Sequence, residues 1–75
     1  MNDLEKIKSK DNLKLGNSYW VFEPGMNKWH GDFEYLGYNE INGEFVFRRV
    51  NFMDKCYFMS VSENDLIDGV CFDYN

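Results

Sequence analysis

The sequence predicts a small, mainly β domain with five short strands, a short N-terminal helix and one helical turn before the last strand. From Gly16 onward, apolar residues recur with a period of two, which is typical of strands with one buried face. Gly, Pro, Asn and Asp separate these runs at short intervals, as they do between antiparallel strands. The chain has 75 residues, of which 44% are hydrophobic, so we expect a single core.

The first fifteen residues differ from the rest in charge and pattern. They carry four lysines and three acids, a net charge of +1, whereas residues 16–75 carry four basic and ten acidic side chains, a net charge of −6. Leu4 and Ile7 lie at helical spacing, which predicts a short helix near residues 3–10. We therefore divide the chain into an N-terminal helical segment, residues 1–15, and a β domain, residues 16–75.

The first two strands are expected at residues 19–23 and 31–41. Pro24-Gly25 follows the first strand and favours a type II turn. Gly37 interrupts the long second run, which indicates a bulge or bend within that strand.

The third and fourth strands are expected as a pair of hairpins. Asn42-Gly43 can hold two positive φ angles and predicts a tight type I′ turn into a strand at residues 44–52. A second turn near residues 53–55 leads into a fourth strand at residues 56–61.

A capped helical turn is expected before the last strand. The Ser62 hydroxyl can accept a hydrogen bond from the backbone of the third residue after it, and Gly69 can end the turn. Residues 70–74 then form the fifth strand.

This order of elements resembles the SH3-like and Tudor-like small barrels. Tyr19-Trp20-Val21 would open the first strand, and the run from Gly31 to Tyr38 would form the bent second strand. The resemblance implies a five-stranded SH3-like barrel. The ALYDY-type run is missing and the first loop, residues 23–30, is short, so a groove for Pro-rich peptides is not expected. The competing OB-fold normally has a longer helix between strands three and four.

The residues offer little for catalysis or metal binding. His30 is the only histidine, and we expect it to be exposed and without a catalytic role. Cys56 and Cys71 lie fifteen residues apart, which does not match zinc-site spacing, and residues 63–69 lack the ligand pattern of a calcium loop. We therefore predict a non-enzymatic protein with no metal and no cofactor.

Composition also bears on the compartment. The apolar runs are too short for a membrane span or a signal peptide, so we expect a cytoplasmic protein whose two cysteines are reduced and buried. Nine Asn, six Lys and no Ala, Thr or Gln suit an AT-rich genome, such as that of a low-GC bacterium or its phage. Lys and Arg are too scarce for direct binding of nucleic acid.

Two groups of residues are candidates for a partner surface. Strands three and four carry apolar side chains on both faces, although a small barrel has only one inside. The expected exposed rings are Trp29, Tyr35, Tyr38, Tyr57 and Tyr74. Residues 56–75 contain four carboxylates and no Lys or Arg. The four carboxylates are Glu63, Asp65, Asp68 and Asp73.

These features predict binding to a protein. The first hypothesis is an acidic, Tyr-rich surface that docks on a basic site of a bacterial nucleic-acid-handling or defence protein. In size and charge the chain is similar to anti-CRISPR and anti-restriction proteins of phages. One alternative is a Tudor-like or SH3-like adaptor that reads a peptide or small ligand through Trp29, Tyr35 and Tyr38, with Asp32 or Glu34 completing a cage. Another is a homodimer that buries the second apolar face.

Overall fold

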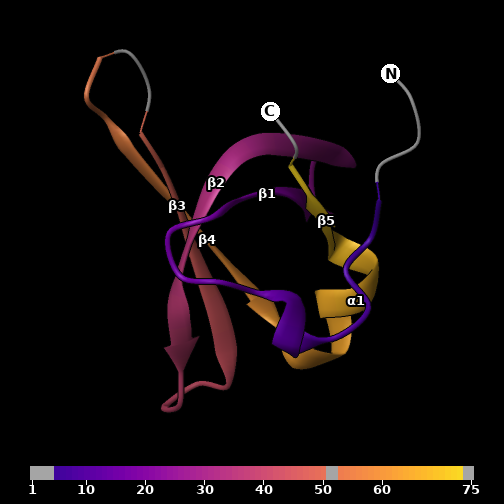
Figure 1. Ribbon diagram of the computed structural model, residues 1–75. Coiled ribbons are helices and arrows are strands. Elements are labelled where there is room, and N and C mark those ends of the chain that lie inside the picture. Colours follow the sequence, from indigo (N-terminus) through magenta and orange to yellow (C-terminus); the bar gives the residue numbers. More distant parts are fainter. Residues whose placement is uncertain (1–4, 51–52, 74–75) are drawn as a thin grey trace.

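The computed structural model describes residues 5–50 and 53–73, which form one five-stranded antiparallel sheet (Figure 1). The strands lie in the order β4-β3-β2-β1-β5. In chain order, the elements are the 3₁₀ helix η1 (Lys10–Asn12), β1 (Ser18–Glu23), β2 (Lys28–Asn39), β3 (Glu44–Val50), β4 (Cys56–Ser62), the 3₁₀ helix η2 (Glu63–Asp65), α1 (Leu66–Gly69) and β5 (Val70–Phe72).

The mainly β prediction is confirmed, and a barrel is not. The strands β4 and β5 stand at opposite ends of the strand order, so the sheet is open rather than closed. The five strands and the helical turn before β5 occur where the sequence indicates them, with ends that differ by up to three residues among those described.

The predicted helix near residues 3–10 is wrong over its described part. Lys6 forms an antiparallel bridge with Cys71, and only Lys10–Asn12 turn as a 3₁₀ helix. The Ile7 N–H donates to the Val70 carbonyl at 3.2 Å, and the Phe72 N–H donates to the Glu5 carbonyl at 2.8 Å. So short a helix is marginal in water, whereas the extended backbone is stabilised by pairing with β5. Figure 1 shows this segment running beside α1 and β5.

The core lies on one face of the bent sheet and includes the N-terminal segment. Ile7 and Leu13 belong to the same buried cluster as side chains of all five strands and α1. The other members are Tyr19, Val21, Phe33, Tyr35, Phe45, Phe47, Val61, Leu66 and Val70. Cys71 is buried and Cys56 is exposed, and both are free thiols, so the prediction of buried cysteines is confirmed only for Cys71.

The bend predicted at Gly37 is confirmed. The register between β2 and β3 shifts between Tyr35 and Gly37, and Gly37 has a φ of 137°. This bulge lets β2 pair with β1 through its first half and with β3 through its second half.

Both predicted turn types are wrong, although the hairpins are in the expected places. Gly43 has a φ of 72°, whereas Asn42 is not left-handed, and residues 40–43 form a four-residue loop. The Asn42 carboxamide oxygen instead accepts from the Glu44 N–H at 3.1 Å. Gly25 does not have positive φ either; the left-handed residue of that loop is Asn27, with a φ of 49°. Each loop has four residues, 24–27 and 40–43, rather than two. The longer loop reverses the chain without two left-handed residues in a row and without a left-handed glycine at residue 25.

Ser62 is the N-cap residue of η2 and the helical turn ends at Gly69, as expected, but the predicted capping bond of the Ser62 side chain is not made. The Ser62 hydroxyl makes no bond to the helix backbone and donates to the Asp65 carboxylate at 3.0 Å. A charged acceptor makes the stronger hydrogen bond, and Asp65 lies within reach of this hydroxyl.

Candidate binding surfaces

A cavity of about 360 Å³ opens between β4, α1 and the first hairpin. Its apolar wall is formed by Phe22, Pro24 and Val61, and carboxylates surround it. We call it the acidic cavity; its lining is Phe22, Pro24, Glu44, Ser60, Val61, Ser62, Asp65, Asp68 and Gly69.

Backbone pairing and one side-chain bond bring the carboxylates together. Glu44, the first residue of β3, pairs with Ser62, the last residue of β4. The turn η2–α1 begins directly after Ser62 and carries Asp65 and Asp68. Because Asp65 accepts from the Ser62 hydroxyl, its carboxylate is held next to the end of β4. Residues from two strands and a helical turn thus share one rim.

Two lysines of the N-terminal segment offset part of this negative charge. Lys6 Nζ lies 3.5 Å from Asp68 Oδ1, and Lys10 Nζ lies 3.8 Å from Glu63 Oε1. Both pairs are exposed to solvent, so they are weak. Glu44 and Asp65 form no ion pair with any residue in 5–50 or 53–73. Together these two lysines and the four carboxylates leave a local charge of −2. The four carboxylates are Glu44, Glu63, Asp65 and Asp68.

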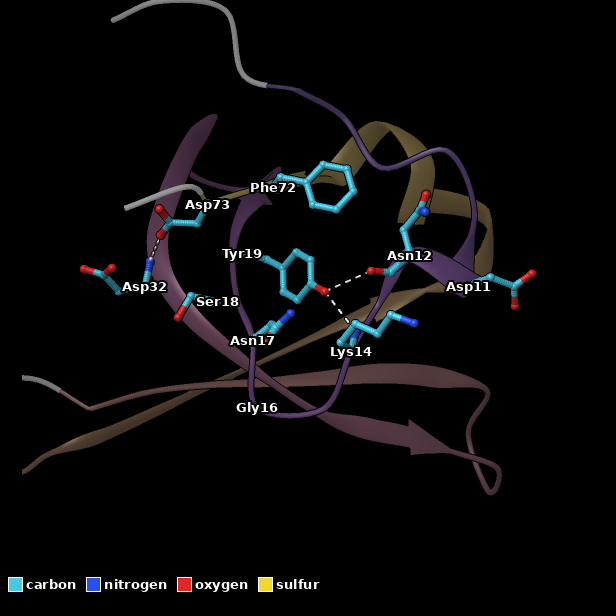
Figure 2. Close-up of a pocket in the computed structure, with 10 residues that line it drawn as sticks. All are labelled: Asp11, Asn12, Lys14, Gly16, Asn17, Ser18, Tyr19, Asp32, Phe72 and Asp73. Atoms are coloured by element: carbon cyan, nitrogen blue, oxygen red, sulfur yellow. Dashed lines mark hydrogen bonds between the residues drawn. The ribbon is translucent and has the colours of Figure 1, made fainter.

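Asp73 lies apart from the other three predicted carboxylates. It lines a cavity of about 620 Å³ (Figure 2), which we call the Tyr19 cavity. Asp73 Oδ2 accepts from the Asp32 N–H at 3.2 Å, while Asp73 Oδ1 is buried without a hydrogen-bond partner. Asp32 is held in a left-handed conformation, with a φ of 60°. The acidic surface predicted as one therefore has two parts.

The Tyr19 side chain, which lines the Tyr19 cavity, makes two hydrogen bonds. The Tyr19 hydroxyl donates to the Asn12 carbonyl at 3.0 Å and accepts from the Lys14 N–H at 2.9 Å (Figure 2). These bonds connect β1 to the segment around η1. Asp11 and Lys14 also line this cavity and carry opposite charges.

The predicted aromatic residues do not form one surface. Tyr35 is only 8% exposed and packs against Phe45 and Phe47, so its predicted exposure is wrong. Burial, with a smaller contribution from Tyr19, raises the pKa of the Tyr35 hydroxyl above 10.0. Trp29 is half-buried against Phe22, with ring centroids 5.3 Å apart. A cage built from Trp29, Tyr35 and Tyr38 would therefore lack Tyr35 as an exposed ring.

Tyr38 and Tyr57 are exposed, as expected, but lie in different places. Tyr38 packs on Phe45 near the β2–β3 loop, with ring centroids 4.8 Å apart. Tyr57 lies in edge strand β4 and lines a cavity of about 510 Å³ with His30 and Arg49. A role in binding stays a prediction for both, and Tyr74 lies outside the described residues.

His30 is not the exposed side chain that the sequence suggests. It is half-buried, and its Nε2 lies 2.9 Å from Glu23 Oε1 across the β1–β2 hairpin. The two residues lie at neighbouring positions of paired strands, since Val21 pairs with His30 and Glu23 with Lys28. The pairing of β1 with β2 brings these two side chains together.

Sequence reasoning missed three residues that matter for the acidic cavity: Phe22, Pro24 and Glu44. The position of Glu44 could have been found, because counting outward from the β3–β4 turn with regular pairing places Glu44 opposite Ser62. Phe22 and Pro24 reach the cavity from the first hairpin, and no local pattern indicates that contact.

In residues 5–50 and 53–73, His, Cys, Asp and Glu side chains do not gather in threes close enough to hold a metal ion. Over the same residues, the helices are too short to cross a membrane. A scan against protein-family models matches no family, and searches of curated proteins and of solved structures return no significant match.

Proposed function

We propose that this is a non-enzymatic binding protein whose acidic cavity receives a Lys or Arg side chain from the basic surface of a protein partner. The observation that carries the proposal is the composition of the acidic cavity. Phe22, Pro24 and Val61 offer apolar surface, and Glu44, Asp65 and Asp68 stand around it.

This combination matches the two parts of a long basic side chain. The methylene groups of Lys and Arg pack on apolar surface while the charged end stays near polar groups. Carboxylates then accept charge-assisted hydrogen bonds from that end. Glu44 and Asp65 keep their charge available, because no described cation pairs with either of them.

The net charge of −5 supports the choice of a basic partner. Opposite charge speeds association and disfavours acidic competitors. A protein that handles nucleic acid has such a basic site, because that site binds phosphates. We therefore propose a bacterial nucleic-acid-handling or defence protein as the partner, and a phage or mobile element as the source of this SH3-like inhibitor, acting in the cytoplasm of the host.

The experiment is a pull-down from lysate of a low-GC bacterial host at low salt, followed by identification of the bound protein and titration against salt. Affinity for the basic partner should fall steeply as salt rises, because screening weakens attraction between exposed charges. The Asp65→Lys/Asp68→Lys variant should lose binding. The control variant Glu40→Lys/Asp54→Lys makes the same change in net charge at two residues that do not line the cavity, and it should retain most of the binding.

Circular dichroism of both variants shows whether each is folded. Binding that is unchanged by salt, or equally weakened in the two folded variants, would show that the acidic cavity is not the docking site.

A further inference from the structure

The two edges of the sheet differ in how they are covered. The outer edge of β5 is paired with residues 5–7 through the Lys6–Cys71 bridge and its flanking hydrogen bonds. At the other edge, β4 pairs with β3 on one side and with no other strand among residues 5–50 and 53–73. In Figure 1, β3 and β4 extend together beyond the rest of the sheet.

Strand β4 lacks the features that usually keep an edge strand from pairing. Its sequence, CYFMSVS, contains no charged residue and no proline. Its register with β3 runs through seven consecutive pairs without a bulge. Phe58 is 62% exposed, and Val50 on the neighbouring strand is 51% exposed. A regular, uncharged edge with exposed apolar side chains is a template for another strand.

Charge differs between the two ends of β4. Lys55 precedes the strand, and Arg49 pairs with Tyr57 near its start, with Asp54 offsetting one of these charges. At its end, Glu44 pairs with Ser62 and Glu63 follows, with Lys10, whose Nζ lies 3.8 Å from Glu63 Oε1, offsetting one of these charges. An antiparallel partner strand with the same arrangement would set each basic end against an acidic end.

We propose that the occupant of this edge is a second copy of the chain, joined by antiparallel pairing of the two β4 strands. A register centred on Met59 places Lys55 opposite Glu63 of the second copy and Phe58 opposite Ser60 of the second copy. Because the dimer is two-fold symmetric, each of these contacts occurs twice. The two five-stranded sheets then form one sheet of ten strands. Ion pairs then form at both ends, and uncharged residues meet between them.

Sedimentation velocity across a wide concentration range tests the association. The wild-type protein should shift with concentration from 9.0 kDa toward a dimer of about twice that mass. Phe58→Lys places a charge on the edge and should abolish the dimer. Ile41→Lys is the matched control, because Ile41 is 96% exposed in the β2–β3 loop, and it should dimerise as the wild type does.

Charge exchange tests the antiparallel arrangement. Lys55→Glu and Glu63→Lys should each weaken the dimer about tenfold, because each puts like charges opposite one another at two symmetric positions. The double variant Lys55→Glu/Glu63→Lys should regain wild-type association within about twofold, because it exchanges the partners of each pair.

A wild-type protein that stays monomeric at millimolar concentration overturns the proposal. So does a dimer that survives Phe58→Lys, that is lost in Ile41→Lys, or that is weaker in the double variant than in either single variant. The partner pull-down depends on Asp65 and Asp68 rather than on these residues, so failure of one proposal can be told from failure of the other.

Discussion

The Tyr19 hydroxyl connects the N-terminal segment to the sheet by two hydrogen bonds, to Asn12 and Lys14. Tyr19→Phe removes both and leaves the Asn12 carbonyl and the Lys14 N–H without this partner. We expect the free energy of unfolding, measured by urea denaturation, to fall by about 1–3 kcal/mol. Tyr38→Phe, at an exposed tyrosine, should change it by less than about 0.5 kcal/mol. Equal effects of the two substitutions would contradict this role of Tyr19.

The two cysteines should react at very different rates. Burial raises the pKa of the Cys71 thiol, and nearby Lys6 lowers it by a smaller amount. Since the thiolate is the reactive form, iodoacetamide at pH 8 should label exposed Cys56 first and Cys71 only after unfolding. Mass spectrometry of the alkylated peptides measures both rates. Similar rates in the folded protein would show that Cys71 is accessible.

At the scale of elements, the bulge in β2 depends on glycine. Gly37 has a φ of 137°, and an added Cβ would meet only the Leu15 side chain at 3.7 Å, an ordinary contact. The cost of Gly37→Ala is therefore backbone strain, and we expect a loss of about 1–3 kcal/mol in the free energy of unfolding.

Gly25→Ala is the matched control for that substitution. An added Cβ there meets nothing within 4 Å, and Gly25 is not left-handed. It should leave stability unchanged or raise it by up to about 1 kcal/mol, since alanine restricts the unfolded chain. Thermal or urea unfolding of the pair measures the difference, and equal destabilisation by both would contradict a bulge that requires Gly37.

At the scale of the whole molecule, the net charge of −5 opposes compaction. The described ion pairs involve side chains that are partly or largely exposed, so each contributes little. We expect the melting temperature to rise as NaCl increases from 0.02 M to about 0.3 M, because screening relieves repulsion among the carboxylates.

The Glu44→Gln/Asp65→Asn variant provides the comparison for this salt effect. It removes two charges from the acidic cavity. The amide oxygen of residue 65 can still accept the hydrogen bond from the Ser62 hydroxyl. Its melting temperature should depend less on salt than that of the wild type. A wild-type melting temperature that falls with salt would show that the ion pairs outweigh the repulsion.

Local residue patterns by themselves determined the mainly β class, the approximate places of the five strands, the bend at Gly37 and the helical turn before β5. Alternation of apolar side chains and the freedom of glycine act within a few residues, so they can be read without the fold. The turn types at Gly25 and Asn42 were not determined in this way, because side-chain bonds such as that of Asn42 compete with the standard turns.

Only the tertiary structure decided which residues meet. The N-terminal segment is extended because β5 offers it backbone partners, which outweighs a weak local preference for helix. Pairing of β3 with β4 brings Glu44 beside Asp65 and Asp68, whereas Asp73 lies against Asp32. The open sheet leaves β4 at its edge. Apart from the Glu44–Ser62 pair, which regular counting from the β3–β4 turn reaches, these outcomes depend on contacts between distant parts of the chain that no local pattern in the sequence indicates.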